Sequence, residues 1–314
     1  MRAVFFGTPE IAVPSLEALC DVADVVGVVC QPDRPSGRGL ELRFPPVKER
    51  ALERGFEVVQ PTKIRTEEFA AWLRERNADV ALVIAYGRIL PPAVLATPRL
   101  GCINLHASLL PKYRGAAPIQ WSVARGESET GIALMQMDEG CDTGPVFTMR
   151  RLAIGPDETA GELAPRLAEL AATMVREDLP RVVAGELTAM SQDHERATLA
   201  PMLAKADGAV DWSQSAGTVH DRARGMSPWP GAHTTLDGKL FKVLATRVAS
   251  RDGHEGPPGA VVGFEGGMLR VACGEGALFL ARGQVEGKRP LDAAQLHAGR
   301  TLTVGSRLGA PAAT

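Results

Sequence analysis

Three polar side chains alternate with apolar residues in the segment Gly101–Pro111: the amide of Asn104, the imidazole of His106 and the hydroxyl of Ser108. Successive side chains of a strand point to opposite faces of a sheet, so we expect these three to project from one face. Buried polar groups cost free energy unless they are satisfied, which favours a site that binds a ligand or moves a proton. A strand end that simply runs into solvent is the alternative interpretation.

A carboxylate follows in the glycine-bounded loop Gly140–Gly144, where Asp142 comes shortly after an apolar run that ends at Met135–Asp138. Ligands of open α/β sheets bind at the carboxyl edge of the strands, and a loop leaving that edge can bring Asp142 close to His106. A plain Asp-Thr-Gly turn is the alternative.

These residues need a sheet to position them, and the first half of the chain alternates short apolar runs with amphipathic stretches. We expect helices at 10–20 and 66–76, with Thr8 capping the first, and a third helix that opens with the capping box Thr159–Glu162. The apolar runs predict strands at 2–6, 24–30, 80–86, 101–105 and 131–137. This alternation indicates an α/β fold with a doubly wound, mostly parallel, Rossmann-like sheet.

The second half changes character. We expect a catalytic domain at 1–188, a linker at 189–205 and a C-terminal domain at 206–314. Glycine turns separate the short segments of this last region, which predicts an OB-like antiparallel β-barrel. Only the Ala/Pro-rich tail from Leu308 is expected to be disordered. The segments are 232–236, 239–246, 259–264, 268–273 and 277–281.

Composition excludes several classes of protein. The 314 residues carry a formal net charge of −2, so no overall field would draw the chain to nucleic acid or a membrane. Five cysteines without a Cys-x-x-Cys pair indicate a reducing compartment. Neither a signal-peptide core nor a run of roughly 20 apolar residues is present. We expect a cytoplasmic monomer, and His106 has no second histidine at metal-ligand spacing.

Asn104-x-His106 followed by Ser108-Leu-Leu-Pro111 and later by Asp142-Thr-Gly144 resembles the 10-formyltetrahydrofolate-dependent formyltransferases. Further segments, in the same order along almost the whole chain, resemble the branch of this family that formylates methionyl-tRNA. Two positions depart from the pattern: Ala107 replaces a frequent Gly, and Leu40–Glu41 replaces a frequent basic pair. The further segments are Phe6–Pro9, Gln31–Gly39, Ala85–Pro91, Arg114–Gln120, Met135–Asp138, Asp211–Ser213 and Pro228–Pro230.

The resemblance implies that Asn104, His106 and Asp142 are catalytic and that 10-formyltetrahydrofolate is the formyl donor, with no metal. It implies that the acceptor is the α-amine of initiator methionyl-tRNA, which becomes N-formylmethionyl-tRNA. It further implies tRNA contacts at Arg34, Arg38, Arg43 and Lys205. The residues implied to bind the donor are Ser108, Leu109, Leu110, Pro111, Tyr86, Gly87, Leu90, Met137 and Asp138.

Within that reaction Asn104 can donate to an oxyanion, and His106 can join it as imidazolium or move a proton. Asp142 can hold His106 charged or take the amine proton, and the residues leave this division open. In the C-terminal region twelve Lys and Arg stand against ten Asp and Glu, a mild excess suited to phosphate contacts. The candidates there are Arg222, Arg224, Lys239 and Lys242.

Four alternatives compete with this interpretation. A formyltransferase acting on an amino sugar nucleotide or a purine precursor would share the same three catalytic residues, and hydrolysis of the donor needs only water in place of the amine. A serine hydrolase built on Ser108 lacks the Gly-x-Ser-x-Gly elbow. A non-catalytic nucleotide- or RNA-binding module is disfavoured because Gly7–Glu10 lacks Gly-x-Gly-x-x-Gly.

Overall fold

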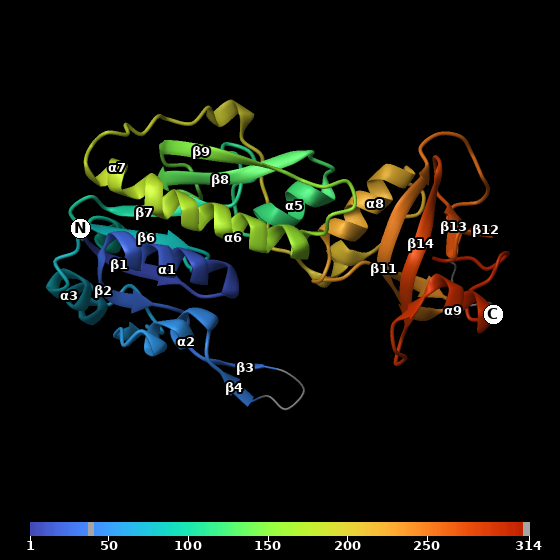
Figure 1. Cartoon of the computed structure of the whole chain (residues 1–314), viewed down its shortest axis with the longest axis horizontal. Helices are drawn as coiled ribbons and strands as arrows, with labels where there is room; N and C mark the ends of the chain where they lie inside the picture. Colours follow the sequence, from blue (N-terminus) through green and yellow to red (C-terminus); the bar gives the residue numbers. More distant parts are fainter. Residues whose placement is uncertain (37–40, 310–314) are drawn as a thin grey trace. The chain divides into compact units, whose positions relative to one another are not determined.

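The structure is a computed structural model that describes residues 1–36 and 41–309 (Figure 1). Contacts between residues divide the chain into two compact units. The N-terminal unit comprises residues 1–118, 130–152 and 164–201, and the C-terminal unit comprises 119–129, 153–163 and the chain from 202 onward.

The N-terminal unit is built on a seven-stranded sheet with the order β5-β2-β1-β6-β7-β8-β9. Strands β1, β2, β5, β6 and β7 are mutually parallel, and β8 runs antiparallel to β7. This confirms the predicted α/β fold with a mostly parallel sheet. The strands are β1 Arg2–Gly7, β2 Asp24–Val29, β5 Val58–Val59, β6 Val80–Ile84, β7 Cys102–His106, β8 Glu129–Gln136 and β9 Val146–Ala153.

The helices follow the amphipathic stretches, with local differences. The chain forms a short 3₁₀ turn at Glu10–Ala12 before the first α-helix, and the Thr8 hydroxyl donates to the Tyr86 carbonyl instead of capping that helix. The capping box is present, because Thr159 and Glu162 exchange backbone and side-chain hydrogen bonds. The helices are α1 Val13–Val22, α2 Pro46–Glu53, α3 Glu67–Glu75, α4 Pro92–Leu95, α5 Pro118–Ala124, α6 Ala160–Glu177 and α7 Leu179–Val183.

A small hairpin projects between β2 and α2. Its strands, β3 Arg34–Ser36 and β4 Glu41–Arg43, pair antiparallel, and Arg34 lies opposite Arg43. The Pro, Gly and Arg residues of this segment predict an irregular loop, and that prediction is wrong for Arg34–Ser36 and Glu41–Arg43, which form strands. Arg38 lies outside the described residues.

The C-terminal unit contains the predicted antiparallel sheet, with the order β10-β11-β14-β13-β12 and β15 paired to β14. Arg307 and Leu308 bridge Ala260 and Leu236 near the two edge strands, as in a small barrel. Leu308 is buried, which corrects the prediction that disorder begins there. The elements are α8 Ala216–Gly225, β10 His233–Leu236, β11 Lys239–Ser250, β12 Val261–Glu265, β13 Met268–Ala272, β14 Ala277–Val285, β15 Leu291–Asp292 and α9 Ala293–Ala298.

The stretch 190–200 lies against the N-terminal unit. Met190 forms a β-bridge with Val146 on β9, and Leu199 forms one with Arg114, eight residues beyond the end of β7. A single 3₁₀ turn, His194–Arg196, separates the two bridges. The polar composition that suggested a linker therefore belongs to a strap on the sheet, whose backbone bonds hold it in place.

Candidate active site at the carboxyl end of β7

Asn104, His106 and Asp142 come together at the carboxyl end of β7. The amide nitrogen of Asn104 lies 3.5 Å from Oδ1 of Asp142, and His106 Nδ1 lies 3.6 Å from the same oxygen. Asn104 and His106 share one face of the strand, as the two-residue period requires, and both are buried. Asp142 is only partly covered, so the site combines two buried groups with a carboxylate that meets solvent.

The orientation of His106 is set by a backbone carbonyl. Its Nε2 lies 2.8 Å from the oxygen of Tyr113, which can only accept a hydrogen bond. Nε2 therefore carries a proton, and the nitrogen that can gain or lose one is Nδ1, which faces Asp142. Tyr113 itself holds a left-handed backbone conformation with φ of +62°.

The second oxygen of Asp142 is held by the chain just beyond Tyr113. The backbone amide of Gly115 donates to Oδ2 at 2.9 Å. Gly115 has a φ of +121°, and a Cβ atom there would lie 2.6 Å from the carbonyl oxygen of Ala200. A glycine is thus required both by the backbone conformation and by the close approach of the strap.

Cys141 stands beside Asp142 and is the one of the five cysteines whose residue is exposed. Its thiol lies 3.7 Å from Oδ2 of Asp142. Partial burial, followed by the neighbouring carboxylate, raises the pKa of the Cys141 thiol. The thiol is therefore protonated at neutral pH, which disfavours a role as nucleophile.

Several residues expected at the donor site have buried side chains. Ser108 is fully buried and its hydroxyl donates to the Lys112 carbonyl, so it does not join His106. Leu110 packs with Ala133, Met135 and Val146. Tyr86 and Leu90 belong to the core cluster around Phe6. Such residues can meet a ligand only through their main chain or by shaping the wall behind it.

Tyr86 has one unusual feature. Its buried hydroxyl has no hydrogen-bond partner among the described residues. Burial raises the pKa of this phenol to about 12, so it stays neutral. Its ring packs edge-on against Phe6 at 5.3 Å between centroids.

The remaining donor-site residues lie nearer to solvent. Gly87 is exposed with a φ of +81°, and nothing lies within 4 Å of an added Cβ. Asp138 accepts hydrogen bonds from the Thr143 hydroxyl at 2.8 Å and the Gly140 amide at 3.1 Å, which ties the start of the Asp142 loop to its end. Leu109, Pro111 and Met137 are partly exposed.

The residues expected to contact tRNA fall into two groups. Arg34, Arg43 and Lys205 are exposed. Arg224 is not: it is 7% exposed, pairs with Asp221 at 2.7 Å and donates to the carbonyls of Gly155 and Glu158. The prediction that Arg224 contacts phosphate was wrong, because its guanidinium is buried and already paired within the C-terminal unit. Arg222 lies over the Trp121 ring.

Sequence reasoning missed the groups that support this site. The Tyr113 carbonyl and the Gly115 amide act through the main chain, so their residue types carried no signal beyond the glycine. Gln192, whose buried side-chain amide donates to the carbonyls of Asp142 and Gly144, was missed because it lies in the presumed linker. Nothing in the sequence distinguishes this buried Gln from the exposed polar residues around it.

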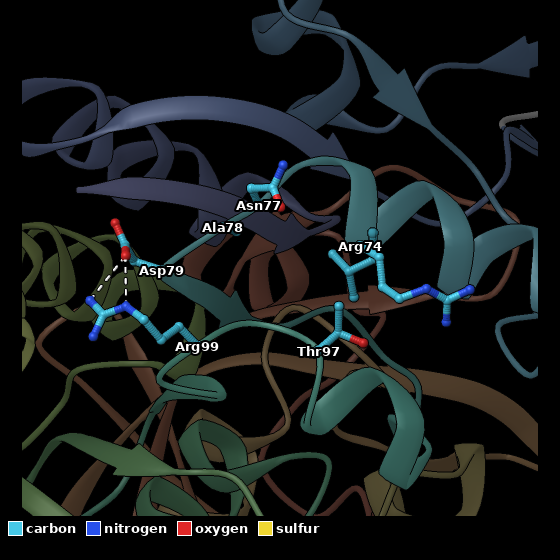
Figure 2. Close-up of a pocket in the computed structure, with 7 residues that line it drawn as sticks. Arg74, Asn77, Ala78, Asp79, Thr97 and Arg99 are labelled. Atoms are coloured by element: carbon cyan, nitrogen blue, oxygen red, sulfur yellow. Dashed lines mark hydrogen bonds and ion pairs between the residues drawn. The ribbon is translucent and has the colours of Figure 1, made fainter.

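A pocket of about 500 Å³ lies elsewhere in the N-terminal unit, between the end of α3 and the segment before β7 (Figure 2). Figure 2 shows Arg99 pointing at Asp79. The Nε of Arg99 donates to Oδ1 of Asp79 at 2.9 Å. Asp79 also accepts from the Arg2 backbone amide. The pocket's acidic group is therefore already neutralised, and none of the candidate residues lines it.

Two searches of the described residues complete this picture. No group of three or more His, Cys, Asp or Glu side chains in residues 1–36 and 41–309 is arranged to hold a metal ion. Within the same ranges, no helix has the length and apolar character needed to span a bilayer.

Comparison with known proteins places both units in one family. Residues 1–179 match the family described as formyl transferase, and residues 202–301 match the C-terminal domain of formyl transferase. A methionyl-tRNA formyltransferase of Sorangium cellulosum is 64% identical over 310 residues, covering 98% of this chain and 100% of the relative. The enzyme of that name in Myxococcus xanthus is 52% identical, covering 98% and 97%.

Solved structures share the fold at lower identity. An N-formyltransferase of Helicobacter canadensis, in complex with folinic acid and dTDP-3-aminofucose, has a TM-score of 0.65 at 15% identity, covering 88% of this chain and 98% of its own. HypX of Aquifex aeolicus, in complex with tetrahydrofolic acid, has a TM-score of 0.61 at 18% identity, covering 97% of this chain and 48% of its own.

Proposed function

This chain belongs to the formyl transferase family, and we propose that Asn104, His106 and Asp142 transfer the formyl group of 10-formyltetrahydrofolate to the α-amino group of initiator methionyl-tRNA. The activity follows from the full-length relatives: the chain is a formyltransferase of methionyl-tRNA. The observation that carries the catalytic assignment is the convergence of Asn104 and His106 on one oxygen of Asp142, at 3.5 and 3.6 Å.

The chemistry asks for little activation of the nucleophile. An α-amine has a pKa of about 8, so a useful fraction is unprotonated at neutral pH. Its nitrogen attacks the formyl carbon, and the bond from that carbon to N10 then breaks. The intermediate between these steps carries an oxyanion, which an N–H of Asn104 can stabilise by about 3 kcal/mol.

The proton must leave the attacking nitrogen and reach N10. His106 can exchange it only at Nδ1, because Nε2 is bound to the Tyr113 carbonyl. Asp142 faces the same position and can stabilise the imidazolium or accept the proton from the amine. Positioned proton transfer of this kind contributes roughly 10²–10⁴-fold to rate.

The donor is proposed to lie along Ser108–Pro111, with its pterin against the main chain of Tyr86–Leu90 and Met137–Asp142. Buried Tyr86, Leu90 and Leu110 would form the wall, and exposed Gly87 leaves room for a ring to approach the backbone. A folate donor is also supported by solved structures of the same fold whose descriptions name tetrahydrofolic acid or folinic acid.

The tRNA is proposed to meet the β3–β4 hairpin through Arg34, Arg38 and Arg43, and the C-terminal unit through Lys205. Arg34 and Arg43 lie opposite each other at the base of the hairpin and are exposed. Paired strands give these arginines a fixed spacing, which suits repeated phosphates better than a loose loop does.

The acceptor is tested by supplying formyl-labelled donor with methionyl-tRNA, free methionine and an amino sugar nucleotide in turn. We expect label on the charged tRNA only. Label on the sugar nucleotide would overturn the substrate, and steady loss of label to formate without any acceptor would identify a donor hydrolase. Arg38→Glu should weaken the tRNA-dependent step and leave donor binding unchanged.

A further inference from the structure

Gln192 is buried in the strap that lies against the N-terminal unit, with 8% of its surface exposed. Its amide nitrogen donates to the carbonyl oxygen of Asp142 at 2.9 Å and to that of Gly144 at 2.7 Å. One side chain thus binds the loop on both sides of Thr143. Both N–H groups of this buried amide are therefore used in hydrogen bonds to one loop, which restrains the backbone of that loop.

The orientation of this amide is fixed by Arg114. Oε1 of Gln192 accepts from Arg114 Nε at 3.1 Å and from Nη2 at 2.7 Å. A guanidinium only donates, so the oxygen must face it and the nitrogen must face the loop. Arg114 is itself 6% exposed, and its main chain is paired with the strap through Thr198 and Ala200.

Arg114 and Gly115 therefore hold the same loop in two ways. The amide of Gly115 binds the carboxylate of Asp142 directly, and Arg114 acts on its carbonyl through Gln192. Asp142 gains from such support because its φ is +54°, a left-handed conformation that non-glycine residues adopt mainly where local hydrogen bonds hold them. Without the tether the backbone could relax and turn the carboxylate away from His106.

We infer that Gln192 is a positioning residue for formyl transfer, which holds the Asp142 loop in its left-handed conformation against the end of β7. This inference rests on the proposed role of Asp142 in catalysis. The strap is in consequence part of the active site, because Gln192 binds the backbone of the Asp142 loop.

Two substitutions separate the donor role from packing. Gln192→Glu keeps the shape of the side chain and its contact with Arg114, but it places oxygen against the two loop carbonyls. Gln192→Leu removes both donors without adding charge. We expect both to lower kcat by roughly 10- to 100-fold, with KM for tRNA and donor changed less than about threefold. Gln284→Leu, a partly exposed amide in the C-terminal unit, is the matched control.

A double-mutant cycle tests whether the Gln192 variants lose kcat because Asp142 is displaced. If Gln192 acts by placing that carboxylate, Gln192→Leu should cost nothing further once Asp142→Asn is present. Losses that multiply would show a general effect on the fold and overturn the inference. If Asp142→Asn alone kept full activity, the catalytic role of Asp142 would fail instead, and the two failures are thereby distinguished.

The loop also carries its own reporter, which needs no activity. Cys141 is exposed and adjacent to Asp142, and Cys20→Ser removes the other thiol that is not buried. We expect Gln192→Leu to speed the reaction of Cys141 with a neutral maleimide severalfold, because the freed loop exposes the thiol and separates it from the carboxylate. An unchanged labelling rate would overturn the tether. Faster labelling with unchanged kcat would show that the tether does not position Asp142 for catalysis, which would overturn the inference.

Discussion

The carboxylate of Asp142 is shared between the two sides of the site: Oδ1 faces Nδ1 of His106 at 3.6 Å, and Oδ2 accepts from the Gly115 amide at 2.9 Å. One oxygen is therefore available for chemistry while the other is fixed to the main chain. This arrangement explains how an exposed loop can hold a carboxylate at a constant distance from a buried imidazole.

Gly115→Ala should disturb the carboxylate without touching a catalytic side chain. The new methyl group would lie 2.6 Å from the Ala200 carbonyl, in a backbone conformation that only glycine adopts readily. We expect a loss of about 1–3 kcal/mol in unfolding free energy and a drop in kcat of at least about tenfold. Chemical unfolding and steady-state kinetics measure the two effects. Wild-type kcat would show that the Gly115 amide does not position Asp142.

His106→Asn should remove proton transfer while retaining a small polar side chain. We expect kcat to fall by roughly 10²–10⁴-fold with little change in donor binding. His233→Asn is the matched control, because that ring nitrogen also lies against a backbone carbonyl, at 3.1 Å from Gly231. A kcat within about threefold of wild type for His106→Asn would exclude His106 from the reaction.

Lys48→Met tests whether Lys48 holds the two ends of the β3–β4 hairpin in place. Lys48 Nζ binds Asp33, just before β3, at 2.6 Å, and it lies 3.8 Å from the centre of the Phe44 ring, just after β4. Its hydrogen bond also lowers the pKa of Asp33. The side chain thus ties both ends of the hairpin together.

Without Lys48 the two ends of the hairpin are no longer held together, so the positions of its arginines become less fixed. We expect KM for methionyl-tRNA to rise about tenfold, with donor binding unchanged. Lys63→Met removes an exposed lysine and controls for the lost charge. An equal rise in KM for both lysine variants would attribute the effect to net charge instead of to the Lys48 contacts.

Glu255→Gln addresses the stability of the C-terminal unit. The hydrogen bonds from Arg270 lower the pKa of Glu255 to about 2. Because the folded-state pKa lies below the ordinary value of 4.5, the stabilisation is full above that value and is lost as pH falls towards 2.

We expect Glu255→Gln to lower the free energy of unfolding by about 1 kcal/mol at pH 7, because solvent screens this partly exposed pair. Near pH 2 the loss should be almost zero. Calorimetric unfolding at several pH values measures the difference. Glu286→Gln, at an exposed position, should show no pH-dependent loss. A difference for Glu255→Gln that stayed constant with pH would contradict the ion pair with Arg270.

Much of the fold could be predicted because apolar runs mark buried strands directly. Asn104 and His106 share a face for the same reason: the two-residue period of a strand is fixed by backbone geometry. Asp142 could be placed near them only by its loop at the same sheet edge, since 38 residues separate it from Asn104.

What could not be predicted depends on backbone groups and distant partners. The Tyr113 carbonyl and the Gly115 amide bind as main chain, so their hydrogen bonds leave no mark in the residue type, and the glycine at 115 shows only that the backbone there is unusual. Ser108 looked available by spacing, but β7 ends at His106 and the hydroxyl turns back to the Lys112 carbonyl. Arg224 looked like a phosphate contact because a residue type cannot reveal that Asp221 already neutralises it.

The most direct test of the account is the single-turnover rate of formyl transfer by Asn104→Ala, with donor and methionyl-tRNA both saturating. If the Asn104 amide stabilises the oxyanion, this rate should fall by about 10²–10³-fold, while the dissociation constants of donor and tRNA stay within about threefold of wild type. A rate close to wild type would contradict the assignment of the active site to the end of β7.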